Sequence, residues 1–168
     1  MRIKLFCLIL LVTVYNFGCS KNPELPSKLQ ISKFRQGLVA FDSLQQPYIY
    51  QQGDAFPYKE NGTCVADNEQ APCQWYGFEF NFKSPEEITK FECITKSSIL
   101  QDQVTPNEVI STNSEIAHWG FTIYGHTGHY LRPQYSYNIT QEVLHMKSSC
   151  YYKGQKILNW HNTIIPNV

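Results

Sequence analysis

The chain has 168 residues, in which 14 lysines and arginines are balanced by 14 aspartates and glutamates. This length suits one domain with a sizeable core, and the even charge balance argues against nucleic-acid binding, which requires a concentrated basic face. Aromatic residues form 14% of the chain and include 11 tyrosines. That composition favours a mostly β domain over a helical one.

The N-terminus has the pattern of an export signal. Arg2 and Lys4 precede an apolar run over 5–14, which is shorter than the roughly 20 residues that a membrane-spanning helix needs. Gly18-Cys19 follows this run and resembles the lipobox of bacterial lipoproteins, in which the cysteine is lipidated and becomes the mature N-terminus. The alternative is ordinary signal-peptide cleavage after Gly18. The two residues before Gly18, at 16 and 17, match neither kind of signal well.

The lipoprotein resemblance implies that Cys19 is the lipidation site, and Ser20 after it implies sorting to the outer membrane of a Gram-negative cell. Lipidation also leaves an even number of mature cysteines, which suits an oxidising compartment. We therefore expect a signal peptide over 1–18, a lipidated tether over 19–28 and a β-rich globular domain over 29–168. The mature protein would belong to the cell envelope, facing the periplasm or the cell surface.

Strands are predicted along most of the domain. Segment 29–49 has no clean period, and strands are the favoured interpretation there. The clearest strand covers 74–82, because four aromatic residues alternate on one side of it. A second strand over 88–95 places Phe91 and Cys93 on one side. Segments 51–74 and 101–114 are rich in turn-forming and polar residues and are predicted to be long loops. The four aromatic residues are Tyr76, Phe78, Phe80 and Phe82.

The C-terminal third predicts a hairpin followed by two more strands. Strand 118–124 directs Trp119, Phe121 and Ile123 inward, and a three-residue loop with left-handed Gly128 returns the chain. Pro133 in the return strand indicates an edge strand or a bulge. The last strands cover 143–152 and 155–165, and short strands between turns predict a single antiparallel sandwich or barrel. The return strand is expected to direct Leu131, Tyr135, Tyr137 and Ile139 inward.

Four cysteines allow three disulfide connectivities. Cys93 shares a side with Phe91, and Cys150 lies in an inward set of the 143–152 strand, so both sulfurs are expected in one core. Cys64 and Cys73 lie near each other in the predicted 51–74 loop. We therefore predict the structural disulfides Cys64–Cys73 and Cys93–Cys150.

Neither a metal centre nor an active site is predicted. His126 and His129 flank one turn, and Glu142 is the one candidate for a further ligand. A metal site needs a third and a fourth ligand. The 67–69 segment, Asp-Asn-Glu, is better explained as a solvated loop than as a calcium site. The sequence contains no nucleophile elbow, zinc-protease motif or phosphate loop. An enzyme would need a site assembled from distant loops, and no cofactor is expected.

One surface of the predicted hairpin carries residues that suit binding. Cross-strand pairing would place Tyr124 beside Tyr130 and Thr122 beside Arg132, and tyrosine with arginine is typical of protein interfaces. The favoured function is a non-catalytic binding protein, such as an immunity protein or inhibitor of an envelope-attacking enzyme. Glycan binding is the alternative. A second core face covered by the other sheet, or simple protection of the sheet edge, is the alternative interpretation of this surface. The candidate binding face consists of His118, Thr122, Tyr124, Tyr130, Arg132 and Gln134.

Overall fold

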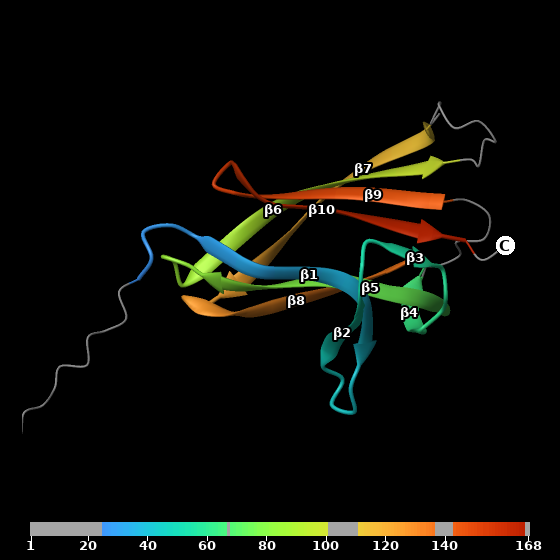
Figure 1. The fold of residues 1–168 in the computed structure, drawn as a ribbon, viewed down its shortest axis with the longest axis horizontal. Coiled ribbons are helices and arrows are strands. Elements are labelled where there is room, and N and C mark those ends of the chain that lie inside the picture. Colours follow the sequence, from blue (N-terminus) through green and yellow to red (C-terminus); the bar gives the residue numbers. More distant parts are fainter. Residues whose placement is uncertain (1–24, 67, 101–110, 137–142, 167–168) are drawn as a thin grey trace, which may run out of the picture.

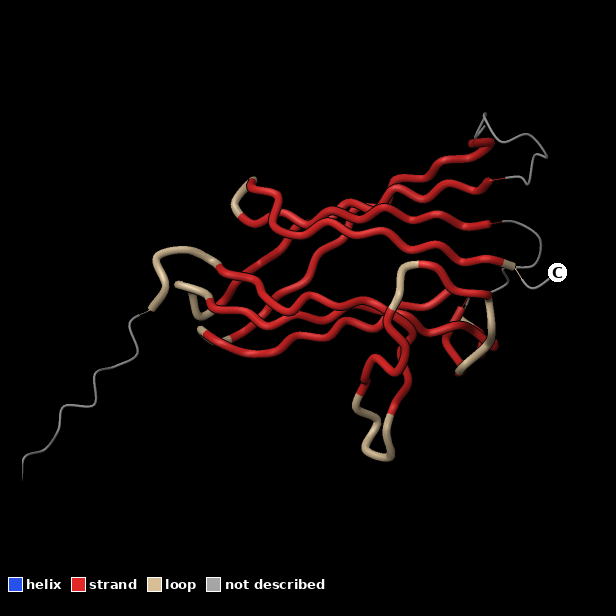
Figure 2. Tube along the Cα trace, viewed as in Figure 1, coloured by secondary structure: helices blue, strands red, loops and turns tan. Residues whose placement is uncertain are grey.

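The computed structural model describes residues 25–66, 68–100, 111–136 and 143–166. Its secondary structure is all strand and turn, in two stacked sheets (Figures 1 and 2). The predicted signal peptide, Cys19, the segment 101–110, Tyr137, Ile139 and Glu142 lie outside the described residues. The strands are β1 (Gln30–Phe41), β2 (Pro47–Gln52), β3 (Ala55–Pro57), β4 (Gly62–Ala66), β5 (Glu69–Lys83), β6 (Ile88–Leu100), β7 (Ser111–Tyr124), β8 (Thr127–Ser136), β9 (Val143–Tyr152) and β10 (Gln155–Ile165).

The predicted β-sandwich is confirmed. The first sheet has the order β2-β1-β5-β4, and β8 also pairs with β5. The second sheet has the order β3-β10-β9-β6-β7. All strand pairs are antiparallel except the short β3 beside β10, which is parallel. Figure 1 shows the two sheets as layers, with β6 and β7 running obliquely from one layer towards the other.

Aromatic side chains fill the space between the sheets. The alternation predicted for β5 is confirmed, because Tyr76, Phe78, Phe80 and Phe82 are all buried. The second sheet supplies the facing rings: Phe78 lies 4.5 Å from Trp160 between ring centroids. Burying each such side chain contributes about 1.5–3 kcal/mol, which makes this aromatic layer the main source of stability.

The predicted Cys93–Cys150 disulfide is confirmed and joins two neighbouring strands of the second sheet. Cys93 on β6 is the direct register partner of Cys150 on β9, with their Cα atoms 4.1 Å apart. Both side chains are buried in the aromatic core, as the face assignment required.

The expectation of a long loop over 51–74 was wrong. This segment contains β3, β4 and the start of β5, which pairs with β4 from Glu69 to Cys73. The strands are only three and five residues long, so turn-forming residues mask their weak alternation in the sequence. The β4–β5 pairing places Cys64 and Cys73 on one face as buried thiols. Oxidation of these two thiols to a disulfide stays a prediction.

The predicted hairpin between β7 and β8 was also wrong. β7 pairs with β6 in the second sheet, whereas β8 pairs with β5 in the first. The turn between them therefore crosses from one layer to the other, and its left-handed residue is Gly125 at φ 86°, not Gly128. Among the described residues β8 has β5 as its one partner strand, so the edge position predicted from Pro133 is confirmed.

The crossover reverses the faces assigned to β8. Tyr130 packs into the core and stacks on Phe121 with the ring centroids 4.8 Å apart. Leu131 and Tyr135 consequently lie on the outer side of the first sheet, against the prediction that they point inward. Tyr135 is 39% exposed. The inward positions of Phe121 and Ile123 on β7 are confirmed.

Candidate binding surface

The structure divides the predicted binding face between two environments. His118, Thr122 and Tyr124 remain on the outer side of β7, where Tyr124 is 71% exposed. Tyr130, Arg132 and Gln134 instead share the inner side of β8, opposite buried residues of β5. The six residues therefore cannot form one interface, because the predicted cross-strand pairing does not exist.

Tyr130 and Arg132 have a structural role between the layers. The Arg132 guanidinium lies over the Trp119 ring, with its Cζ 5.1 Å from the ring centroid. Burial raises the pKa of Tyr130, and the neighbouring Arg132 charge opposes part of that rise. The cation–π contact and the stacked Tyr130 ring hold the β8 edge of the first sheet against the second sheet.

The outer face of the second sheet is an open strand surface that contains three of the predicted residues, His118, Thr122 and Tyr124. Because Cys93, Cys150 and Trp160 point into the core, their neighbours along β6, β9 and β10 point outward. The outer face is defined here as the outward residues of the four long strands of this sheet. Its central members are His118, Ile116, Ile94, Lys96, Ser149, Lys147, Tyr151, Asn159, His161 and Lys156.

This outer face is hollowed rather than smooth. A hollow of about 380 Å³ is lined by Ile94, Lys96, Lys147, Ser149, Tyr151 and Lys156. A second hollow of about 420 Å³ shares Lys96 and Lys147 with the first and extends to His145 and His161. The two lysines therefore stand on the ridge between two depressions, where a ligand could reach both.

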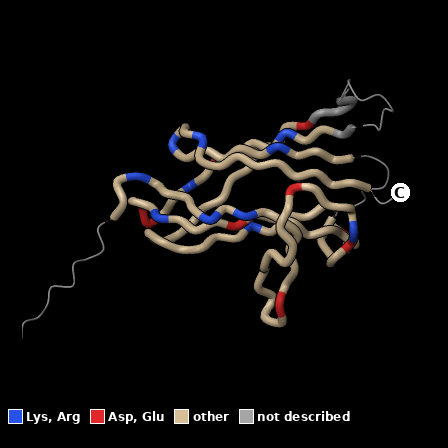
Figure 3. Tube along the Cα trace, in the orientation of Figure 1, with Lys and Arg blue, Asp and Glu red and all other residues tan. Residues whose placement is uncertain are grey.

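Basic residues form a row across the middle of the outer face. Lys96 on β6 is the direct partner of Lys147 on β9, and Lys147 is the direct partner of His161 on β10. Among the described residues neither lysine forms an ion pair with a carboxylate, while His161 Nε2 lies 2.8 Å from Asp54 Oδ2. Figure 3 shows basic positions on both layers of the sandwich. Like charges directly opposite each other on neighbouring strands are destabilising.

The first sheet carries a contrasting, internally satisfied charge cluster. Glu79 is 4% exposed although it lies on the outer side of β5, and Arg35 Nε donates to its Oε1 at 2.5 Å. On the other side, His129 Nε2 lies 3.4 Å from Glu79 Oε2. This carboxylate ties β1, β5 and β8 together and leaves no charge for a ligand.

Aromatic residues also gather on the outer side of the first sheet. Trp75 makes edge contacts with Phe41 and Tyr135 at centroid distances of 5.1 and 5.2 Å. Trp75 Nε1 donates to the carbonyl oxygen of Thr63. Tyr50, which is 48% exposed, lies beside this cluster through Asn61, whose amide nitrogen is 3.4 Å from its hydroxyl. The sequence argument missed this group because it did not predict the β5–β8 pairing, and because it expected Tyr135 to point inward.

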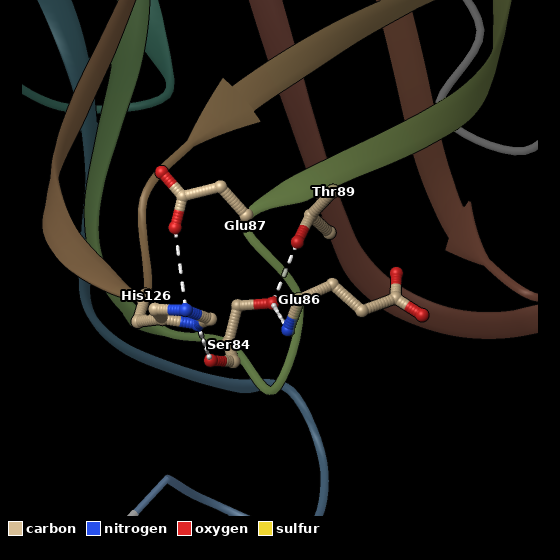
Figure 4. A network of polar contacts seen from close by, with 5 residues as sticks. All are labelled: Ser84, Glu86, Glu87, Thr89 and His126. Carbon is tan, nitrogen blue, oxygen red and sulfur yellow. Dashed lines mark hydrogen bonds and ion pairs between the residues drawn. The ribbon is translucent and has the colours of Figure 1, made fainter.

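A serine, a histidine and a glutamate meet at one end of the sandwich, but not as a catalytic triad (Figure 4). His126 Nδ1 lies 3.1 Å from the backbone oxygen of Ser84, and its Nε2 lies 3.2 Å from Glu87 Oε2. The Ser84 hydroxyl instead bonds Thr89 Oγ1 at 2.6 Å and is fully buried. Since no histidine nitrogen faces that hydroxyl, the network fastens the β5–β6 turn to the β7–β8 turn.

The histidines of the turn do not converge on a common ion. His126 and His129 each lie beside a different carboxylate, Glu87 and Glu79. In the part of the chain that the structure describes, no three His, Cys, Asp or Glu side chains form a group that could hold a metal. Within the same residues, no helix is long and apolar enough to cross a membrane.

No protein-family model matches this sequence, and no curated protein matches it. The fold and the surface nevertheless define a class, a disulfide-linked β-sandwich whose second sheet has a row of basic side chains on an outer face that no described element covers. Function is therefore argued from that surface.

Proposed function

We propose that the protein is a non-catalytic binding protein of the bacterial envelope that engages a protein partner through the outer face of its second sheet. One observation carries the proposal: this four-stranded face has no covering element among the described residues, yet it is hollowed and bears exposed apolar side chains. Ile116 is 59% exposed and Tyr124 is 71% exposed. Apolar contacts combined with polar and charged groups are the usual composition of protein interfaces.

The attachment of the chain supports this choice of face. The described chain begins at Leu25 and enters β1, which belongs to the first sheet. Figure 1 shows this segment leaving from one end of the layer that contains β1. A tether anchored through a lipidated Cys19 would therefore leave the outer face of the second sheet free to meet a partner.

Within this class we favour an immunity protein or inhibitor that neutralises an enzyme attacking the envelope. Such a protein needs a rigid surface rather than a reactive centre. The second sheet is rigid, because the Cys93–Cys150 disulfide joins the two strands that carry Lys96 and Lys147. A preorganised face binds with a smaller entropic cost than a mobile one.

Site-specific photo-crosslinking in the native bacterium tests the proposal. A photoreactive amino acid at Thr122 or Ser149 on the outer face should crosslink to one discrete protein. A matched probe at Ser32 or Asn81 on the first sheet should not yield that product. The same protein crosslinked equally from both sheets, or no protein product from the outer face, would contradict the proposed interface.

Glycan binding is the second candidate, and the aromatic cluster of the first sheet favours it. Tyr50 is 48% exposed and is linked to this cluster through Asn61, and aromatic rings with polar tips suit sugar rings. Pull-down with purified peptidoglycan tests this role. Tyr50→Ala should weaken retention, whereas Tyr124→Ala on the other sheet should leave it unchanged.

A further inference from the structure

We infer that the protein partner presents carboxylates to the outer face, and that Lys96 and Lys147 are the centre that receives them. This inference rests on the proposed function and names the chemistry of its partner. The starting observation is the register of the second sheet, which places Lys96 directly opposite Lys147. Directly opposite side chains have Cβ atoms about 4.5–5.5 Å apart, so the two ammonium groups share one neighbourhood.

The protein itself does not neutralise this pair. Both lysines are exposed, and no described aspartate or glutamate lies within ion-pair distance of either. By contrast, Glu79 and Glu86 are each occupied by a basic residue elsewhere, Arg35 and Lys153. Two described carboxylates lie at this face: Glu92 is four residues from Lys96 along β6, and Asp54 is paired with His161 at the β10 side.

The surroundings of the pair extend the positive region. Lys156 lines the same hollow as both lysines, whereas His161, the next residue of the row, is paired with Asp54. Lys156 Nζ lies 6.0 Å from the centroid of the Tyr151 ring, a cation–π contact that leaves its charge unneutralised. An isolated lysine pair costs the fold stability, whereas a bound carboxylate between the lysines would turn that repulsion into attraction.

An acidic protein surface fits this face better than a sulfated or phosphorylated polymer. The row of charges is short and is bordered by Ile116 on β7 and Ile94 on β6, so contact requires apolar as well as anionic groups. A protein surface offers both, and such electrostatic complementarity sets association rate and specificity.

A fluorescent peptide of fifteen glutamates, read by fluorescence anisotropy, serves as the carboxylate probe for the full mature protein. The Lys96→Glu/Lys147→Glu variant should bind it at least about tenfold more weakly, since two attractions become repulsions. Lys28→Glu/Lys83→Glu, with the same change in net charge on the first-sheet side, is the matched control and should bind nearly as the wild type does. Raising the salt concentration from 50 to 300 mM should weaken wild-type binding, because these charges are exposed.

Thermal stability distinguishes an effect of surface charge on binding from an effect of misfolding. Lys96→Gln should raise Tm by about 1–2 °C, because it removes a cross-strand repulsion. Equal peptide binding by the two double variants would overturn the inference, as would binding of heparin in place of the glutamate peptide. If the Lys96→Glu/Lys147→Glu variant crosslinks to its partner as strongly as the wild type does, the inference is also overturned, while the proposed protein-binding function stays intact.

Discussion

Replacing Cys93 and Cys150 with alanine should remove a large part of the free energy of unfolding. The disulfide closes a sequence separation of 57 residues, for which the chain-entropy model gives a stabilisation of about 4 kcal/mol. Domains of this size have a total free energy of unfolding of about 5–15 kcal/mol. The loss should lower Tm by roughly 10 °C, at about 2–4 °C per kcal/mol.

Urea unfolding followed by tryptophan fluorescence measures this loss. The control is Cys64→Ala/Cys73→Ala, which keeps the Cys93–Cys150 bond, so that reducing agent should destabilise the control by the same amount of about 4 kcal/mol. Reduction should leave the Cys93→Ala/Cys150→Ala variant nearly unchanged if Cys64 and Cys73 are already thiols. A loss below about 1 kcal/mol in the Cys93→Ala/Cys150→Ala variant would refute the argument that this bond constrains the unfolded chain.

Three further outcomes are expected. Arg132→Ala should lower the free energy of unfolding by about 1–2 kcal/mol, because the guanidinium lies over Trp119. Tyr124→Ala on the outer side should change it by roughly 0.5 kcal/mol or less. Equal effects of the two variants in thermal melts would contradict the assignment of Arg132 to the inner side and Tyr124 to the outer side. Burial, and next the hydrogen-bonded Cys64 thiol, raise the pKa of Cys73 to about 12. A raised thiol pKa favours the folded state below pH 9, and that contribution should disappear as the pH rises from about 9 to 12; iodoacetamide should therefore label Cys73 slowly at pH 9 in native, reduced protein, and labelling as fast as in urea would contradict this. Cys19→Ser should release the protein from the membrane fraction and abolish fatty-acid labelling, and unchanged labelling would exclude Cys19 as the lipid site.

Local periodicity was enough to predict much of the framework. The alternation of four aromatics in β5 identified its core face, and β9 and β10 were predicted with the bounds that the structure shows. The Cys93–Cys150 bond also followed from local faces, since a cysteine beside inward residues must itself point inward. These features depend on a two-residue period within single strands, which the sequence displays directly.

Strand partners depended on information that local patterns do not contain. A short turn after β7 suggested a hairpin, but the chain crosses between layers, and Phe121 of the second sheet stacks on Tyr130 of the first. Tyr130 and Leu131 point to opposite faces of β8, so either face could have been the inner one. The outward orientation predicted for His118, Thr122 and Tyr124 is therefore confirmed, whereas the one predicted for Tyr130, Arg132 and Gln134 was wrong.

The sequence by itself determined a disulfide-linked β domain, because hydrophobic alternation and cysteine position are local; the export signal, which is also a local pattern, stays a prediction. Only the tertiary structure decided which charges become neighbours. Lys96 and Lys147 are separated by two intervening strands in the chain, and the β6–β9 register brings them side by side on a protein whose total charge is balanced. The register between two strands is set by how the hydrophobic faces of a whole sheet pack against the other sheet. A row of basic side chains can therefore form in a protein whose composition shows no excess of positive charge.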